Sequence, residues 1–175
     1  MAPPTSRPIV VIPDARLRLP ATPVRVPDRG IERLVAEMFE AMRRASGVGL
    51  AANQIGEPGA VAIIDTGEER AILINPVVEH LADEAVDWEG CLSVPHFVAQ
   101  VRRAGSVTVR AEGLDGRWRR YRGHGLFARA LLHETDHLAG RLYVDLVEAD
   151  ALVDTRIHES PPSDDGRLTG LPISG

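Results

Sequence analysis

The stretch GLFARALLHETDHL, residues 125–138, decides how this chain folds and what it can bind. One face of it carries four residues at helical spacing: Leu126, Ala130, His133 and His137. Gly140 follows at the point where a helix would stop. The pattern predicts a helix over 125–138. Because most of its other residues are apolar, we expect this helix to be buried in the core.

The end of this helix is an H-E-x-x-H motif, residues 133–137. Residues four apart on a helix lie on one side, about 5–6 Å apart at Cβ, so His133 and His137 can reach one metal ion. Glu134 can accept a proton from water that the ion has acidified. The alternative is two surface histidines on a charged helix. Buried histidines need partners, because unpaired buried polar groups are costly, so the motif favours a metal site.

Two histidines leave the ligand set incomplete, because a catalytic site of this kind usually has three protein ligands. The longer motif H-E-x-x-H-x-x-G-x-x-H fails at its last position, where Tyr143 stands. The remaining candidates are Glu148, Glu159 and Cys91, the one cysteine of the chain. A lone cysteine can also be a small buried apolar residue or a nucleophile paired with histidine. The segment EGCLS, residues 89–93, favours a ligand.

A third informative segment is GVGLAANQIG, residues 47–56. Its small residues allow tight packing around a loop, and Gln54 is a neutral amide that can donate to a developing oxyanion. The alternative is a glycine-rich surface turn with an exposed Gln54. The glycines at its start are not a dinucleotide fingerprint, because they follow a predicted helix and not a strand.

Composition excludes several classes of protein. The formal net charge is −5, which gives no electrostatic support for nucleic-acid binding. The chain has no lysine, which excludes Schiff-base catalysis and a lysine-containing phosphate loop. One cysteine excludes an internal disulfide. No stretch approaches about 18 apolar residues, and the N-terminus lacks the apolar core of a signal peptide. We therefore expect a cytoplasmic protein, with no membrane span and no direct DNA binding.

The rest of the chain predicts an α+β fold. An amphipathic stripe over 31–42, with Asp28 as its N-cap, predicts a first helix that ends near Ser46-Gly47. Short apolar or alternating runs then predict strands at 61–65, 72–78, 97–101, 107–111 and 118–121. Asp115-Gly116 predicts a hairpin between the last two. We expect small antiparallel or mixed sheets packed around the central helix that carries the H-E-x-x-H motif.

Residues 1–160 are expected to form a single catalytic domain. Within it, the proline-rich residues 1–30 predict an extended arm, and 141–147 a short apolar strand or turn. Residues 161–175 are rich in Ser, Pro, Asp and Gly and predict a mobile C-terminal tail.

Together the three segments resemble the peptide deformylases. The motifs G-x-G-L-A-A-x-Q, E-G-C-L-S and H-E-x-D-H of that family occur here in order at 47–54, 89–93 and 133–137. The resemblance runs from about Pro8 to Val147. It implies a metal-dependent hydrolase that removes the N-formyl group from the formylmethionine of newly made polypeptides and releases formate.

The resemblance also implies the metal site. Cys91, His133 and His137 would ligate one divalent ion per chain. Fe(II) would be the ion in the cell, and zinc, nickel or cobalt could replace it in a purified sample. This set fits the chemistry, because a thiolate is a soft ligand that suits zinc or ferrous iron.

Catalytic and substrate-binding roles follow from the same resemblance. Glu134 would act as general base and then as acid, while the Gln54 side chain and the Leu92 N–H would bind the formyl oxygen as it becomes an oxyanion. The backbone of Val48 and Gly49 would pair with the peptide. The methionine pocket would be lined by residues on the loop and on the helix: Val48, Leu126, Ala130 and His133.

Some features depart from the family or extend it. His96 follows the proline of the second motif, where glycine is common, and is either a loop histidine or a spurious fourth ligand. We also expect Glu89 and Arg103 to form an ion pair that orients the site. The expected partners are N-formylated nascent peptides, with transient ribosome contact, and the expected state is a monomer. The rival functions are an H-E-x-x-H protease, a metal-binding module without catalysis, and a hydrolase of another N-acyl group.

Overall fold

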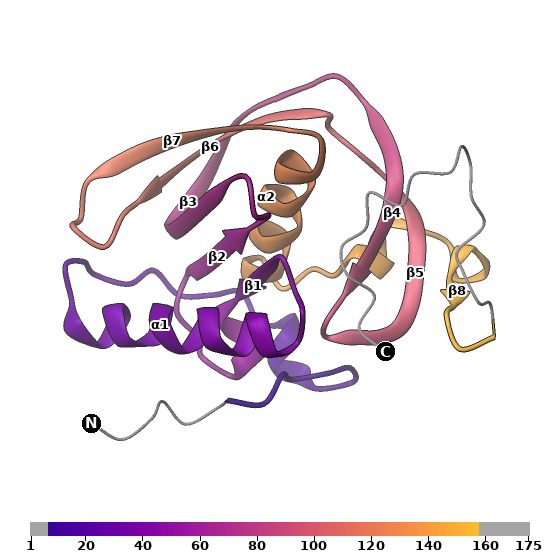
Figure 1. The fold of residues 1–175 in the computed structure, drawn as a ribbon, viewed down its shortest axis with the longest axis horizontal. Helices are drawn as coiled ribbons and strands as arrows, with labels where there is room; N and C mark the ends of the chain where they lie inside the picture. The colour runs from indigo at the N-terminus through magenta and orange to yellow at the C-terminus, as the bar shows by residue number, and fades with distance from the viewer. Residues whose placement is uncertain (1–6, 158–175) are drawn as a thin grey trace.

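The structure, a computed structural model, describes residues 7–157 and has the predicted α+β architecture (Figure 1). Two helices, α1 (Arg29–Arg44) and α2 (Gly125–Leu138), combine in the described part with two antiparallel sheets. The first six residues of the predicted arm and the predicted tail at 161–175 lie outside the described residues.

The larger sheet has the order β1-β2-β3-β6-β7. Its strands are β1 (Gly49–Ala51), β2 (Val61–Asp65), β3 (Arg70–Ala82), β6 (Ser106–Glu112) and β7 (Trp118–His124). The smaller sheet has the order β4-β5-β8. Its strands are β4 (Ala85–Cys91), β5 (Val94–Arg103) and β8 (Val153–Asp154). Short 3₁₀ helices complete the described chain: η1 (Ala15–Arg18), η2 (Ala52–Ile55), η3 (Tyr143–Leu146) and η4 (Ala149–Ala151).

The two helices cover opposite faces of the larger sheet, and β2 shows why. Val61 and Ile63 pack with α1, whereas Ala62 and Ile64 pack with α2 (Figure 1). Since successive side chains of a strand point to opposite faces, a strand covered on both faces reads as a continuous apolar run. This accounts for the uninterrupted sequence of β2.

Helix α2 is buried, as its sequence predicts, and its bounds match the predicted 125–138. Small side chains line the contact between the sheet and α2. The sheet contributes Ala51, Ala62, Ala71 and Ala111, and α2 contributes Ala128 and Ala130. Small residues on both sides let the helix lie close to the sheet. The backbone of α2 is therefore held firmly enough to place its side chains accurately.

Helix α1 begins as predicted, because the Asp28 side chain accepts a hydrogen bond from the Ile31 N–H at 3.0 Å. It ends at Arg44, shortly before the predicted stop. The five predicted strands are all present, with extended ends in four of them, and Asp115-Gly116 lies in the β6–β7 hairpin. The proline-rich arm is not wholly extended, since η1 interrupts it.

The strand β4 is one that the sequence pattern does not predict. Its one fully buried position is Glu89, so the inward face carries a charge where an apolar residue would mark a strand. It pairs with β5 in a long hairpin beside α2 (Figure 1). The expected strand or turn at 141–147 forms η3 instead. There Tyr143 is buried and its hydroxyl donates to the Phe97 carbonyl at 2.7 Å.

Among the residues described, no helix combines the length and apolar character that crossing a bilayer requires.

The C-terminal stop of α2 generates a stability prediction. Gly140 has φ +73°, and a Cβ there would lie 2.5 Å from the Arg18 carbonyl oxygen. Gly67 also has a positive φ, +87°, but its Cβ would meet nothing within 4 Å. Gly67→Ala should lower the free energy of unfolding by about 1 kcal/mol through backbone strain alone. Gly140→Ala should cost about 1–3 kcal/mol more, because the close contact adds to that strain.

Urea unfolding of both variants measures the difference between them. An equal loss of stability in the two variants would contradict the close approach of Gly140 to Arg18.

Candidate metal centre

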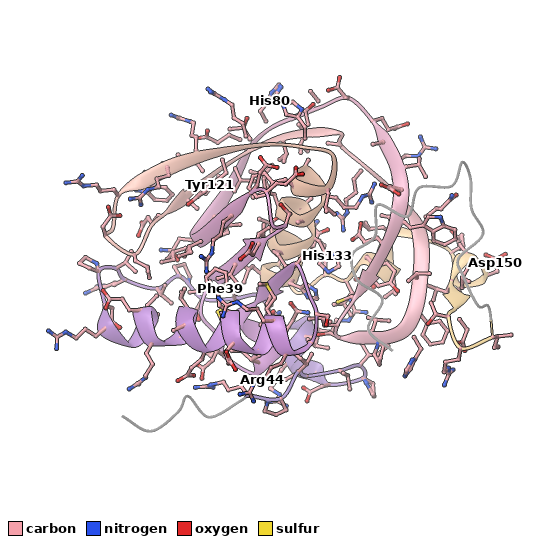
Figure 2. All side chains as sticks on the ribbon, viewed as in Figure 1. Phe39, Arg44, His80, Tyr121, His133 and Asp150 are labelled. Atoms are coloured by element: carbon pink, nitrogen blue, oxygen red, sulfur yellow. The ribbon has the colours of Figure 1, made fainter. Side chains whose placement is uncertain are left out.

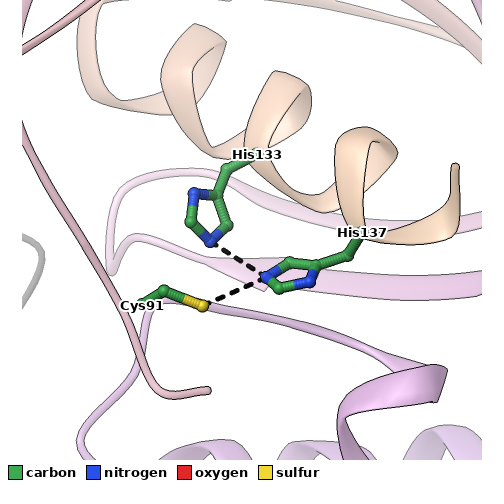
Figure 3. A group of neighbouring side chains, drawn as sticks. All are labelled: Cys91, His133 and His137. Carbon is green, nitrogen blue, oxygen red and sulfur yellow. Dashed lines mark hydrogen bonds between the residues drawn. The ribbon is translucent and has the colours of Figure 1, made fainter. Parts of the chain in front are cut away.

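Three side chains from two parts of the fold converge at the buried side of α2. His133 and His137 lie one helical turn apart, and Cys91 lies at the end of β4 (Figure 3). The Nε2 atoms of the two histidines are 3.1 Å apart, and Cys91 Sγ is 3.2 Å from His137 Nε2. Figure 2 shows His133 near the middle of the molecule, whereas Arg44, His80 and Asp150 lie at its periphery.

This donor set fits a metal ion. All three ligand atoms lie within 4.8 Å of one another, and no fourth His, Cys, Asp or Glu joins them in the described part of the chain. Zinc binds sulfur at about 2.3 Å and imidazole nitrogen at about 2.0–2.1 Å, so ligands of one ion lie a few ångströms apart. Burial lowers the pKa of His137 well below its ordinary value, which keeps this imidazole neutral with a free lone pair.

Glu89 orients His133. Its Oε1 lies 2.6 Å from His133 Nδ1, and because a carboxylate only accepts, Nδ1 carries the proton and Nε2 is left to face Cys91 and His137. Burial alone would raise the pKa of Glu89, but hydrogen bonds from Arg103 and His133 lower it below its usual range. Burial alone would lower the pKa of His133. Hydrogen bonds with Cys91 and Glu89 outweigh this effect and raise the pKa of His133 above its ordinary value.

The predicted ion pair between Glu89 and Arg103 is confirmed. Arg103 Nε lies 2.8 Å from Glu89 Oε2, and its Nη2 lies 2.6 Å from Oε1. The same guanidinium uses Nη1 to bond Asp136 at 2.8 Å. Both Glu89 and Arg103 are buried, so the pair forms away from bulk solvent.

Gln54 is held so that its N–H groups face the site. Its Oε1 accepts from the Ala51 N–H at 2.9 Å, which fixes the orientation of the amide. Its Nε2 then lies 3.1 Å from Ser93 Oγ and 3.7 Å from Cys91 Sγ. The side chain is 2% exposed, which rules out the exposed surface turn considered for this segment.

Glu134 is buried and lines the same cavity as Cys91 and His133, and its Oε2 has no hydrogen-bond partner in the described part of the protein. Burial raises its pKa to about 7. The space for it is provided by Gly49. A Cβ on Gly49 would overlap the Glu134 carboxylate and lie 2.9 Å from its Cδ. The glycine is therefore required for room, since its φ is not left-handed.

A cavity of about 120 Å³ opens over this centre. Three of the predicted substrate-binding residues, Val48, Gly49 and Ala130, line it together with Cys91, Leu92, His133, Glu134 and Gln54. Leu126 is half-buried and is not among the lining residues, so its part in a methionine pocket stays a prediction. His96 lies at the cavity but is exposed, and it is not part of the ligand cluster.

Three side chains that shape the centre were not predicted from the sequence: Arg129, Asp136 and Ser93. Arg129 donates to Glu89, Asp136 accepts from Arg103, and Ser93 accepts from Gln54. Asp136 and Ser93 lie inside the recognised motifs, and their polar character was a usable signal. Arg129 carried a signal too, because it is a charged residue four positions before His133 in an otherwise apolar helix.

The family model described as polypeptide deformylase matches residues 6–151. A peptide deformylase from Acidobacterium capsulatum is 43% identical over 148 residues, covering 82% of this chain and 87% of that protein. Peptide deformylase 1 from Pseudomonas syringae pv. tomato is 45% identical over 141 residues, covering 78% and 84%.

Solved structures of peptide deformylases share the fold of this chain. A peptide deformylase from Legionella pneumophila superposes with a TM-score of 0.81 at 39% identity, covering 84% of this chain and 89% of that one. A Met-Ala-Ser-bound class I type b peptide deformylase from Acinetobacter baumannii has a TM-score of 0.78 at 28% identity, covering 83% and 100%. The motifs, the fold and these relatives together place the chain in the polypeptide deformylase family.

Proposed function

We propose that this protein is a metal-dependent hydrolase that removes the N-formyl group from the formylmethionine of newly made polypeptides, releasing formate. One observation carries the proposal. The Glu134 carboxylate and the Gln54 amide line the same cavity as Cys91 and His133, which cluster with His137. A purely structural metal site needs neither a free carboxylate nor an amide donor, whereas hydrolysis of an amide needs both.

Cys91, His133 and His137 would hold the ion. Because hydrogen bonds with Cys91 and Glu89 raise the pKa of His133, this imidazole would lose a proton when the ion binds. One thiolate and two neutral imidazoles would then leave a divalent site with a net charge of about +1, and this donor set suits Fe(II), with zinc, nickel or cobalt as substitutes. The bound ion would polarise the formyl oxygen and acidify water. The Glu89 carboxylate, through His133 Nδ1, fixes the ring orientation that this binding requires.

Glu134 is the general base and then the general acid in this proposal. Its unpaired Oε2 is free to accept the proton of the attacking water. It can then deliver that proton to the amide nitrogen as the bond to the formyl carbon breaks, which leaves a free amino terminus and formate. Its burial among apolar and small residues keeps bulk water away from this transfer.

Gln54 and Leu92 would stabilise the oxyanion. Because the Ala51 N–H holds the Gln54 oxygen, Gln54 Nε2 is directed toward Ser93 and Cys91 at the wall of the cavity. Leu92 follows Cys91 in the turn of the β4–β5 hairpin and lines the cavity as well. Donors fixed before the reaction stabilise developing charge without reorganisation.

The peptide would bind along β1. This strand is the edge of the larger sheet, so its outer backbone groups face no neighbouring strand of that sheet. Val48 and Gly49 lie where this edge meets the cavity, and Ala130 provides a small wall on α2 for the methionine side chain. The relative from Acinetobacter baumannii binds Met-Ala-Ser, which is the deformylated form of the substrate proposed here.

The substrate also sets the partners and the compartment. Formylated chains are found as they leave the ribosome, so we propose that the protein works in the cytoplasm as a monomer with transient ribosome contact. A protease for internal bonds is disfavoured, because Tyr143 stands where the third histidine would be and bonds Phe97 instead. Another N-acyl substrate is the second candidate, since the chemistry of the centre would be the same.

Formate release from formyl-Met-Ala-Ser by anaerobically purified, Fe(II)-loaded protein tests the function. Glu134→Gln should lower kcat by roughly 10²–10⁴-fold with metal content unchanged, because only proton transfer is lost. Cys91→Ser should lose both metal and activity. Release of acetate from acetyl-Met-Ala-Ser at a higher rate would favour the second candidate. Full activity and metal content in Cys91→Ser would contradict the ligand set.

Gly49 gives a second test of the site geometry. Gly49→Ala should displace the Glu134 carboxylate, and a displacement of about 1 Å can cost about 10²-fold in kcat. Metal content should stay at the wild-type value, because the three atoms nearest to a Cβ on Gly49 all belong to Glu134. Wild-type turnover in Gly49→Ala would contradict the role of Glu134.

Metal content tests whether His96 is a fourth ligand. His96→Ala should retain one metal ion per chain by elemental analysis, because the exposed His96 lies outside the ligand cluster. A loss of metal comparable to that of Cys91→Ser would identify His96 as a fourth ligand.

A further inference from the structure

Arg129 is a buried cation that the proposed reaction does not use. Its side chain is only 5% exposed, and it lies on α2 one turn before His133, so both residues face the β4–β5 hairpin. Its Nη1 lies 2.9 Å from Glu89 Oε2 and 3.0 Å from the Val101 carbonyl, and its Nη2 lies 3.5 Å from the Ala85 carbonyl. A buried arginine is costly unless its donors are used, and here they are shared between one carboxylate and two strands.

These contacts complete the hydrogen bonding of Glu89. Its Oε1 accepts from Arg103 Nη2 and His133 Nδ1, and its Oε2 accepts from Arg103 Nε and Arg129 Nη1. An ionised carboxylate offers about four lone-pair directions, so all of them are taken. Rotation of the carboxylate would break bonds at both oxygens. Without Arg129, Glu89 Oε2 would accept only the hydrogen bond from Arg103 Nε. Arg129 therefore adds the second restraint on this oxygen.

Arg129 also balances charge. Arg103 serves two carboxylates, since it bonds Glu89 and Asp136. Without Arg129, these two acidic groups would share one buried guanidinium, and the other cation at Asp136, Arg141, is exposed. With Arg129 present, the linked set of two arginines and two carboxylates is neutral, with Glu89, Arg103 and Arg129 buried and Asp136 half-buried. Glu89 can then orient His133 without a surplus of negative charge beside the ligands.

Arg129 finally joins the two parts of the fold that supply the ligands. Ala85 begins β4, and Val101 lies opposite Asp87 in the paired β5. Arg129 therefore donates to both strands at the open end of the hairpin, away from its turn. The far end of the same hairpin carries Cys91, and α2 carries both histidines. A single guanidinium thus bonds to the carboxylate behind His133 and to the hairpin that positions Cys91.

We propose that Arg129 is a positioning residue of the metal centre, which acts through Glu89 and the β4–β5 hairpin to hold His133 and Cys91 in the geometry that binds the ion. This inference rests on the proposed function for the identity of the ligands. It adds that metal retention depends on a residue that touches none of them.

The test compares Arg129→Met and Arg129→Lys with the wild type. The control is Arg102→Met on the same hairpin, whose exposed side chain pairs with Glu84. The proteins are loaded with Co(II), and two properties are measured: the rate at which a chelator removes the ion, and the visible absorption spectrum of the bound ion. Kinetics of formyl-Met-Ala-Ser hydrolysis are recorded separately.

Arg129→Met should lose the ion about 10–100-fold faster than wild type, with an altered Co(II) spectrum and a lower kcat at nearly constant KM. Arg129→Lys should lose it severalfold faster, because a lysine keeps the charge but cannot bridge the carboxylate and the two carbonyls. Arg102→Met should match the wild type. Adding Arg129→Met to Glu89→Gln should change metal loss less than it does in the wild-type background, since the two residues act together.

Wild-type rates of metal loss and an unchanged spectrum in Arg129→Met would overturn the inference. If Arg129→Met does not fold, Arg129→Lys decides in the same way. Fully additive effects with Glu89→Gln would also overturn it, because they would show that Arg129 acts independently of Glu89. The wild-type kinetics separate the two proposals: an inactive but metal-loaded wild type contradicts the deformylase function, whereas an active wild type with unaffected Arg129 variants contradicts only this inference.

Discussion

The hydrogen bond between the Glu89 carboxylate and His133 Nδ1 is the interaction on which the rest of the site depends. It determines which nitrogen of His133 faces Cys91 and His137, and it places a negative charge in the interior. A buried carboxylate is stable only when it is paired and fully hydrogen-bonded. Arg103 and Arg129 supply that pairing, and Arg103 in turn binds Asp136 near the end of α2. The ligand helix and the β4–β5 hairpin are thereby joined through one acidic side chain.

Packing supplies the second condition, which is close approach. Helix α2 lies against a sheet surface rich in alanine, such as Ala51 and Ala62, and the start of β1 approaches Glu134 so closely only because Gly49 has no side chain. The Glu134 carboxylate and the Gln54 amide then line one small cavity with Cys91 and His133. The small residues of the first motif are therefore a steric requirement of the site as much as of the fold.

The two helices could be predicted from local sequence patterns. Helix α2 has a clear 3.6-residue period and a glycine stop, so its bounds follow from local pattern, and Asp28 caps α1 as expected. Strand β4 could not be predicted by alternation, because its buried position is Glu89, a residue whose burial depends on arginines distant in sequence. Tyr143 likewise gave no local sign that it would anchor η3 on Phe97. The choice of Cys91 over Glu148 needed the three-dimensional structure or the family resemblance, since spacing alone left both open. Glu159, the other candidate, lies outside the described residues.

In the proposed site, one metal ion is held by Cys91, His133 and His137, with the Glu134 carboxylate beside it. Diffraction from crystals of the metal-loaded protein, recorded at the absorption edge of the ion, would locate the ion. We expect a single anomalous peak per chain, about 2.3 Å from Cys91 Sγ and about 2.1 Å from the Nε2 atoms of His133 and His137. A peak bound through other residues, such as His96 or a downstream glutamate, or coordinated by the Nδ1 atom of His133, would contradict it.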